Sequence, residues 1–223
     1  MLAIIQARLS SNRLRGKVLK KINNKYLLER VFENVLKSKK VKKIIVATSS
    51  NQSDDDIVKF CLQKKINYFR GKLDNVSGRF FDLLKNCKEK SFIRICADSP
   101  FLDTNLIDRG ISIFKRKKID IVTNVYPRSY PKGQSIEIFR KDIFIDNISK
   151  IKSAYYKEHF PKYFYENSKK FKIKNFKYKK NYSSLNLSVD SEKDLKIARK
   201  IAEIIDNQKT RVSLDKIIKL FKK

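Results

Sequence analysis

Apolar positions in the first 123 residues follow two alternating spacings. Compact apolar runs predict buried strands at 2–6, 43–48, 66–69, 91–96 and 119–123. Apolar residues three and four positions apart predict helices over 25–37, 54–63, 78–88 and 104–117, with Ser53 as a possible N-cap of the second. Strands that alternate with helices are typical of an α/β fold, so we expect a doubly wound, mostly parallel sheet.

The spacing changes after position 123. Residues 124–180 are short aromatic-rich segments that start with the turn sequence PRSYPKG, and they predict a small α+β insertion lobe. Within them, residues 169–180 alternate lysine with apolar residues, which favours an amphipathic strand. The apolar run LNLSV predicts a strand that ends at Val189, and Ser191 is expected to cap a helix over 191–205. Without an internal repeat, 1–223 is expected to be one domain that contains this lobe.

Composition narrows the class of protein. The chain has 223 residues, of which 41% are apolar, and this is enough for one substantial core. It contains no apolar run of about 18 residues, so we expect no membrane insertion. The first residues lack the basic and small-residue features of a signal peptide. Three cysteines without CxxC spacing disfavour a disulfide framework or a zinc site, and they favour a cytoplasmic location.

The net charge of +30 raises the hypothesis of a nucleic-acid-binding protein. The lysines are spread over the whole chain, however, and no nucleic-acid-binding motif is present. We therefore expect no specific nucleic-acid partner. An anionic small substrate such as a nucleoside triphosphate suits the same charge, and the nucleic-acid reading stays open as the alternative from a different class.

A basic loop follows the first predicted strand directly. Ligands of parallel sheets bind beyond the carboxyl ends of the strands, and guanidinium and ammonium groups suit polyphosphate. The loop is neither GxxxxGK[ST] nor GxGxxG, and taken alone it could equally be a solvated surface loop. Its candidate phosphate ligands and turn residue are Arg8, Ser10, Ser11, Arg13, Arg15, Gly16 and Lys17.

Two aspartates also follow predicted strands. Asp98 comes after SFIRIC, and Asp190 comes after LNLSV. Aspartates at the carboxyl ends of two distant strands can converge, and their hard oxygen ligands suit Mg²⁺ bound together with a nucleoside triphosphate. The competing interpretation is that each aspartate caps the helix that follows it.

The string ARLSSNRLRGKVL resembles the signature A-R-x-x-S-x-R-x-x-G-K of the cytidylyltransferases that activate sugar acids, among them the 3-deoxy-manno-octulosonate and acylneuraminate cytidylyltransferases. It is most similar to the branch of spore-coat polysaccharide biosynthesis protein F. Arg15 stands where the family usually has proline. Further segments match in the family's order up to about position 205: RICADSPFLD, NVYPRSYPKGQSIEIF, KEHFPKYF and LSVDSEKDL.

The resemblance implies a sheet of the nucleotide-diphospho-sugar transferase (Rossmann-like) type. It also implies transfer of CMP from CTP to a sugar or sugar acid, with release of pyrophosphate, in cell-surface polysaccharide biosynthesis. A homodimer that pairs through the lobe at 124–180 is expected. Another nucleotide or another sugar remains an alternative within the same enzyme class.

The loop, the two aspartates and the resemblance together give a set of candidate site residues. Arg8 and Lys17 are the expected catalytic residues, and Asp98 and Asp190 are the expected ligands of Mg²⁺. His159, the only histidine, is expected to be a packed structural residue. The nucleotide is expected to bind Ala7, Arg8, Ser10, Ser11, Arg13, Lys17 and Asp98. The acceptor, base or ribose is expected to contact Arg79, Arg94, Arg128 and Glu137, although each of these could instead form an exposed salt bridge.

Overall fold

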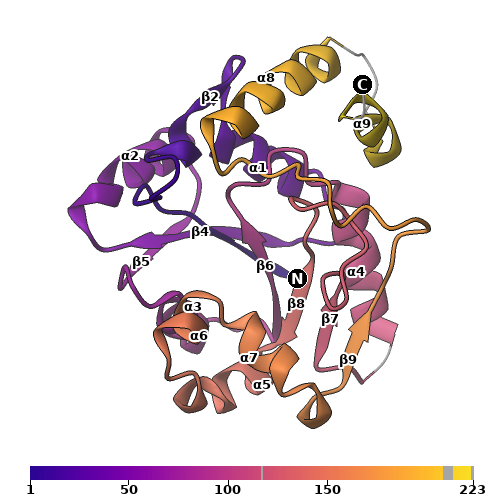
Figure 1. The fold of residues 1–223 in the computed structure, drawn as a ribbon. Coiled ribbons are helices and arrows are strands. Elements are labelled where there is room, and N and C mark those ends of the chain that lie inside the picture. The colour runs from indigo at the N-terminus through magenta and orange to yellow at the C-terminus, as the bar shows by residue number, and fades with distance from the viewer. Residues whose placement is uncertain (117, 208–212, 222–223) are drawn as a thin grey trace.

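A computed structural model describes residues 1–116, 118–207 and 213–221. A seven-stranded sheet runs through the molecule with helices on both faces (Figure 1). In spatial order its strands are β5 (Tyr68–Gly71), β4 (Lys43–Ser49), β1 (Leu2–Gln6), β6 (Ser91–Cys96), β8 (Glu137–Arg140), β7 (Ile121–Thr123) and β9 (Ile173–Asn175).

Most neighbouring strands are parallel. β1 pairs in parallel with both β4 and β6, and β4 pairs in parallel with β5. β8 is inserted antiparallel between β6 and β7, while β9 is parallel to β7. The predicted α/β class is therefore confirmed, and the strands predicted at 2–6 and 91–96 are found at those positions.

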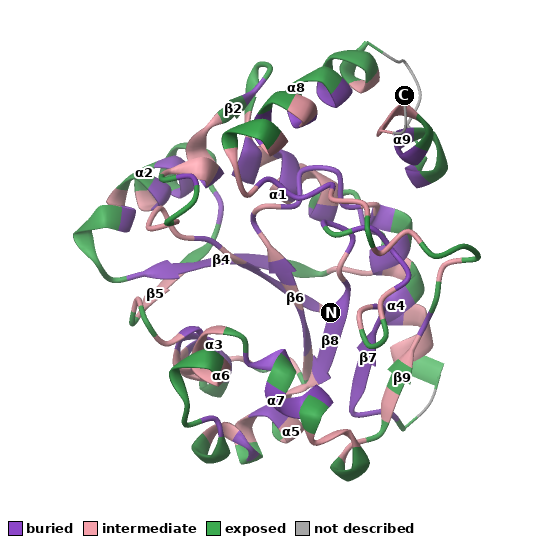
Figure 2. Ribbon diagram, viewed as in Figure 1, coloured by how far each residue is buried: buried purple, intermediate pink, exposed green. Residues whose placement is uncertain are grey.

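The sheet separates two hydrophobic clusters, because successive strand residues point to opposite faces. On β1, Ala3 and Ile5 belong to one cluster, whereas Leu2 and Ile4 belong to the other. All four side chains are fully buried, and the central strands are buried on both faces (Figure 2). Covering both faces explains why these strands are continuous apolar runs rather than alternating ones.

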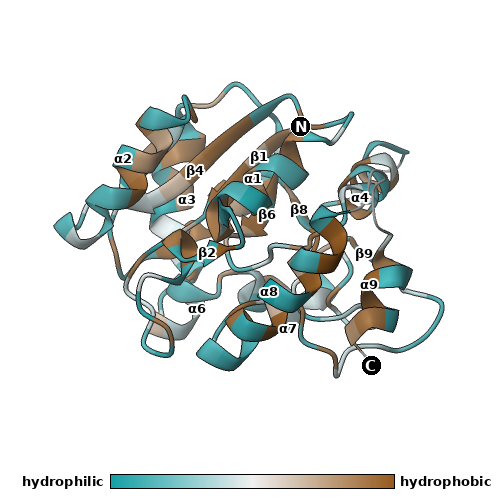
Figure 3. Ribbon diagram, turned by 90° about the horizontal axis from the view of Figure 1, so that it is seen from above, coloured by the Kyte–Doolittle hydropathy of each residue, from teal (hydrophilic) through white to brown (hydrophobic). Residues whose placement is uncertain are grey.

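The helices form the outer layers of the molecule. Viewed from above, they present hydrophilic residues to solvent and hydrophobic residues to the sheet (Figure 3). The cluster on one face draws on α1, α2, α4, α8 and α9, and the cluster on the other face draws on α3, α5 and α7. The helices are α1 (Leu27–Leu36), α2 (Asp55–Gln63), α3 (Val76–Lys85), α4 (Thr104–Arg116), α5 (Lys141–Asp146), α6 (Ala154–Glu158), α7 (Pro161–Glu166), α8 (Glu192–Asp206) and α9 (Leu214–Phe221).

Residues 124–180 contribute to the main sheet. They supply β8 and β9 and, between these strands, the short helices α5 to α7. The amphipathic strand predicted over 169–180 is limited to β9, and it follows a 3₁₀ turn at Ser168–Lys170. Whether this region pairs two copies of the chain stays a prediction.

Three local predictions were wrong. Lys25 and Tyr26 form the strand β3 (Lys25–Tyr26), which pairs with β2 (Lys21–Ile22) across a turn where Asn23 has φ 53°, so α1 begins later than predicted. Ser53 caps no helix: it lies inside the 3₁₀ turn Gln52–Asp54, and the side chain of Asn51 accepts its N–H. No strand precedes Asp190 among the described residues 185–189.

The helix predicted over 191–205 is α8, and its N-cap Ser191 is confirmed. Lys117, at the predicted end of the fourth helix, lies outside the described residues. Within the described ranges, no helix combines the length and the apolar character needed to cross a membrane.

Candidate functional site

The loop at 7–17 folds back on the backbone of Leu9. The pairing of β1 with β4 extends to Ala7, whose N–H donates to the carbonyl of Ala47 at 3.1 Å. The carbonyl of Leu9 then accepts the N–H of Ser11 at 2.8 Å and that of Gly16 at 2.9 Å. Gly16 has φ 70°, which glycine adopts without steric cost and which allows the chain to turn into the 3₁₀ helix Lys17–Leu19.

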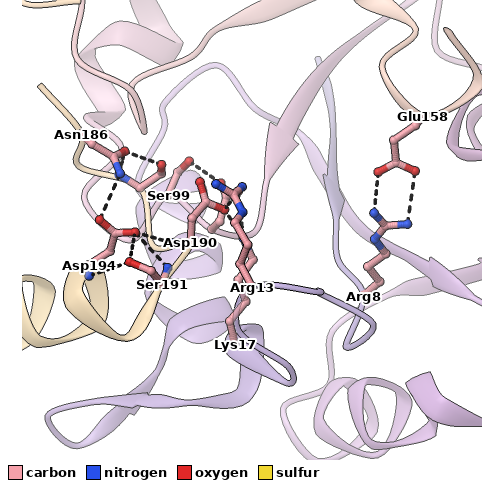
Figure 4. A network of polar contacts seen from close by, with 11 residues as sticks. Arg8, Arg13, Lys17, Ser99, Glu158, Asn186, Asp190, Ser191 and Asp194 are labelled. Carbon is pink, nitrogen blue, oxygen red and sulfur yellow. Dashed lines mark hydrogen bonds and ion pairs between the residues drawn. The ribbon is translucent and has the colours of Figure 1, made fainter. Parts of the chain in front are cut away.

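Lys17 is placed between the two predicted aspartates. Its Nζ lies 2.7 Å from Oδ1 of Asp190 and 3.4 Å from Oδ2 of Asp98. The lysine side chain is 12% exposed, and Arg13 makes a second ion pair with Asp190 at 3.0 Å (Figure 4). Residues separated by more than 170 positions therefore converge at the carboxyl ends of β1 and β6.

Asp190 reaches this place without a strand before it. The N–H of Val189 donates to the carbonyl of Asp98 at 2.8 Å, which joins the two loops directly. The cap of α8 is formed by Ser191, whose Oγ and backbone N–H bond to Asp194. The carboxylate of Asp190 is thereby left to face Lys17, so the competing interpretation that Asp190 caps the helix does not hold.

The carboxylates around Lys17 are the candidate ligands for a metal ion. Among the described residues, no group of three or more His, Cys, Asp or Glu side chains is arranged to hold a metal ion. Asp98 and Asp190 nevertheless converge on a single ammonium group. Mg²⁺ is commonly bound by one or two carboxylates together with substrate phosphates and water. The pair thus fits a cation that binds with a nucleotide.

Arg8 points away from the two aspartates and pairs with Glu158 at the end of α6. Nη2 of Arg8 lies 2.8 Å from Oε1 of Glu158, and Nη1 lies 3.2 Å from Oε2 (Figure 4). Glu158 was not among the predicted site residues. It lies in the segment KEHFPKYF that matches the family's order, but its pairing with Arg8 could not be predicted because the two residues are 150 positions apart.

These groups line a cavity of about 470 Å³. Every residue predicted to bind the nucleotide lines it: Ala7, Arg8, Ser10, Ser11, Arg13, Lys17 and Asp98. Asp190 and Arg94 also line it, as do Gln6, Glu158 and His159, which were not predicted as site residues. The Gln6 side chain accepts a hydrogen bond from Nε of Arg94 at 2.9 Å.

A second cavity of about 430 Å³ adjoins the first, since Arg94, Cys96 and His159 line both. It contains the predicted residues Arg128 and Glu137. Arg94 and Glu137 form a buried ion pair that bridges β6 and β8.

Tyr165 binds the carboxylate oxygen of Glu137 that Arg94 does not contact. Burial raises the pKa of Tyr165, so its hydroxyl stays protonated and donates to Oε1 of Glu137 at 2.7 Å. The Tyr165 ring stacks on Tyr126 with centroids 5.0 Å apart. Arg128 donates to the carbonyl of Pro131 at 3.3 Å and to the hydroxyl of Ser135 at 3.0 Å. The lining of the second cavity therefore includes aromatic rings and hydrogen-bonded polar groups.

His159 and Cys96 lie where the two cavities meet. His159 is exposed at the end of α6, so the expectation of a packed structural histidine was wrong. Partial burial lowers the pKa of His159, which favours neutral imidazole at pH 7. Burial raises the pKa of the Cys96 thiol to about 12. The junction is therefore lined by neutral groups together with the Arg94 guanidinium.

Two candidate binding residues, Arg15 and Arg79, line neither cavity: Arg15 is exposed on the loop, whereas Arg79 is buried. Its side chain is 1% exposed and donates to the carbonyls of Lys72 at 2.9 Å and Leu73 at 3.0 Å. Desolvation lowers the pKa of Arg79, and the nearby Asp54 carboxylate opposes that shift. The arginine holds the segment after β5 in place from inside the protein, which a sequence pattern cannot distinguish from a binding role.

The sequence is similar to a family model and to several known proteins. A model of the cytidylyltransferase family matches residues 2–221. An uncharacterized protein of Methanocaldococcus jannaschii is 32% identical over 92% of this chain and 84% of its own length. The Bacillus subtilis spore coat polysaccharide biosynthesis protein SpsF is 32% identical over 71% of this chain and 67% of its own length. The 3-deoxy-manno-octulosonate cytidylyltransferase of Elusimicrobium minutum is 30% identical, over 56% of this chain and 50% of its own.

Solved structures of similar fold include cytidylyltransferases. A cytidylyltransferase from Leptospira borgpetersenii superposes with a TM-score of 0.92 at 25% identity, covering 99% of this chain and 92% of the other. CMP:2-keto-3-deoxy-manno-octonic acid synthetase, solved with CTP, superposes with a TM-score of 0.70 at 16% identity over 91% and 98% of the two chains, and it supports the fold alone. With the family model spanning almost the whole sequence, and with every signature residue except Gly16 lining one cavity, the chain belongs to the cytidylyltransferase family.

Proposed function

We propose that this protein transfers CMP from CTP to a sugar acid and releases pyrophosphate. The observation that carries the proposal is the pair of adjoining cavities, one lined by the basic loop and two aspartates and the other by aromatic and cationic side chains. Two substrates that react with each other need adjoining sites, because the reacting atoms must come within about 3–3.5 Å.

The first cavity suits the triphosphate. Arg8, Arg13 and Lys17 supply positive charge to its lining, and the hydroxyls of Ser10 and Ser11 add hydrogen-bond donors. Phosphoryl and nucleotidyl transfers depend mainly on positioning and on stabilising the charge that develops on the phosphate oxygens. Lys17 is the best placed for this role because its ammonium is the most enclosed of the three cations.

Asp98 and Asp190 would hold Mg²⁺ with the nucleotide. When bound there, the metal would neutralise phosphate charge and polarise the reacting oxygen. Without a metal ion, the ammonium group of Lys17 offsets the repulsion between these two carboxylates, because it pairs with both.

The charge of the second cavity favours an anionic acceptor. Arg94 and Glu137 form an ion pair, whereas Arg128 and Lys162 form no ion pair with the described residues that line this cavity. A carboxylate on the acceptor would complement that excess, and a guanidinium binds carboxylate in a bidentate manner. The stacked rings of Tyr126 and Tyr165 supply an apolar wall for the sugar.

In the proposed reaction, a hydroxyl oxygen of the acceptor attacks the α-phosphorus of CTP. A new oxygen–phosphorus bond forms, the bond from the α-phosphorus to the bridging oxygen breaks, pyrophosphate leaves with that oxygen, and the hydroxyl proton passes to the solvent. Lys17 and Arg13 face the phosphates during this step, while the second cavity orients the acceptor.

A pyrophosphate-release assay tests the proposal. The four ribonucleoside triphosphates are combined with a panel of sugar acids and of neutral sugars of the same size, with Mg²⁺ or with EDTA. Turnover is expected with CTP, a sugar acid and Mg²⁺. Turnover with a neutral sugar only would overturn the assigned acceptor class, turnover with another nucleotide only would overturn CTP, and full turnover in EDTA would exclude the metal.

The nucleic-acid hypothesis has its own test. Binding to duplex DNA and to RNA is measured across a salt series, because contacts to phosphates alone weaken steeply as salt rises. We expect weak, sequence-independent binding that disappears near physiological salt. Tight binding that discriminates between sequences at that salt would favour the alternative function.

A further inference from the structure

The buried carboxylate of Asp54 lies outside both cavities and contacts the basic loop. Asp54 is fully buried just before α2, where a helix-capping role would be expected. Its side chain makes no cap bond. Oδ1 instead accepts the backbone N–H of Leu9 at 2.7 Å, across 45 positions of sequence. A buried carboxylate is costly unless it is hydrogen-bonded, so both of its oxygens need donors.

The second oxygen of Asp54 accepts hydrogen bonds from the end of β4. Oδ2 accepts the backbone N–H of Ser49 at 3.2 Å and also the hydroxyl of Ser49, which is itself fully buried. The Asp54 charge is thus held between two backbone segments. The nearby guanidinium of Arg79, buried on the backbone after β5, supplies a compensating positive charge.

Leu9 is the residue on which the loop closes. Its N–H is held by Asp54, while its carbonyl accepts the N–H groups of both Ser11 and Gly16. The neighbours of these backbone groups are the side chains that line the first cavity: Arg8 on one side, and Ser10, Ser11 and Lys17 on the other. Displacing Leu9 would therefore displace the phosphate-facing groups together.

We propose that Asp54 is a positioning residue for the nucleotide loop, acting through the peptide groups of Leu9 without touching the substrate. This inference rests on the proposed function for its effect on CTP, although the anchoring of the loop is independent of it. Preorganised donors stabilise phosphate charge without the cost of rearranging during the reaction. A loop with a free Leu9 would have to be ordered by the nucleotide itself.

The main test compares Asp54→Asn with Asp120→Asn. Asp120 is a matched control, because it is also buried and accepts a backbone N–H, that of Lys172 at 2.8 Å, but it precedes β7 and lines neither cavity. Amide hydrogen exchange of the ligand-free protein is measured at Leu9, Ser11 and Gly16. Exchange at these three amides is expected to accelerate in Asp54→Asn and to remain unchanged in Asp120→Asn.

CTP binding by calorimetry supplies the second readout. We expect the Kd for CTP to rise about tenfold in Asp54→Asn, the scale of one lost hydrogen bond to a charged group. Loss of binding by Asp120→Asn in equal measure, or unchanged exchange in Asp54→Asn, would overturn the proposal. If the unmodified protein did not bind CTP, the proposed function would fail while the exchange experiment would still decide the role of Asp54.

Should Asp54→Asn not fold, Ser49→Ala replaces it. This variant removes one hydroxyl donor and leaves the bond from Leu9 to Asp54 in place. A smaller acceleration at the same three amides is expected. Exchange identical to that of the unmodified protein would count against the proposed anchor.

Discussion

Replacing Lys17 by methionine removes the charge that joins Asp98 to Asp190 while keeping much of the side-chain volume. Lys17 lies 2.7 Å from one carboxylate and 3.4 Å from the other. At an effective dielectric constant of about 20, the gross attractions are about 6 and 5 kcal/mol. Most of this is offset by the loss of hydration, and the two carboxylates are about a quarter exposed.

The net loss of stability is therefore modest. Arg13 remains on Asp190 and water can reach both carboxylates, so we expect Lys17→Met to lose about 1–2 kcal/mol of unfolding free energy. For a chain of this size that lowers Tm by roughly 2–8 °C. The catalytic loss should be larger, because removing one preorganised donor from developing charge typically costs about 10²–10³ in kcat.

The assay is pyrophosphate release at saturating CTP, with calorimetric Tm measured in parallel. Lys20→Met is the control: Lys20 is close in sequence and pairs with Glu192 at 3.1 Å, but it does not line the first cavity. The control should keep its kcat within about twofold. Lys17→Met with undiminished kcat, or a fall of the same size in Lys20→Met, would refute the role given to Lys17.

Three further outcomes are expected. Glu158→Gln should lower the Kd for CTP by up to about fivefold, because Glu158 would no longer compete with phosphate for Arg8 and this partly exposed ion pair is worth at most about 1 kcal/mol. Weaker CTP binding, measured by calorimetry, would mean that Glu158 orients Arg8 instead. His159 should titrate below pH 6.5 by NMR, since partial burial lowers its pKa, and its neutral form should therefore persist as the pH falls through that value; a midpoint above 6.5 would contradict this. Burial raises the pKa of the Cys96 thiol to about 12, so its alkylation in the folded protein should stay slow from pH 7 to pH 9 when followed by mass spectrometry. Rapid labelling of Cys96 at pH 8 would contradict the raised pKa.

Several features of the candidate site could be predicted from local pattern. Compact apolar runs identified the central strands, since a strand covered on both faces has to be apolar throughout. The carboxyl-end rule for parallel sheets then predicted that the loop after β1 and Asp98 after β6 lie at the site. The structure confirms that they converge, with Lys17 of the loop 3.4 Å from Asp98. This could be predicted because each position follows directly from the end of one strand, and the two strands run in the same direction.

Other features were settled only by tertiary packing. Asp190 reaches Lys17 through a backbone bond from Val189 to Asp98 rather than from a strand. Arg79 has the charge of a ligand but is buried on backbone carbonyls. Periodicity reports which side of an element is covered, and it does not report which distant residue covers it.

By itself the sequence determined the α/β class, the central strands, the position of the basic loop after the first strand and the family, because these depend on contiguous residues and on their order along the chain. Only the tertiary structure decided the pairing of Glu158 with Arg8, the second cavity, and the anchoring of Leu9 by Asp54. Each of these features brings together residues that lie far apart in the sequence, 45 positions for Leu9 and Asp54 and 150 for Arg8 and Glu158. The physical reason is that hydrogen bonds and ion pairs need donor and acceptor within about 3 Å, and such proximity is set by how the layers pack rather than by local spacing.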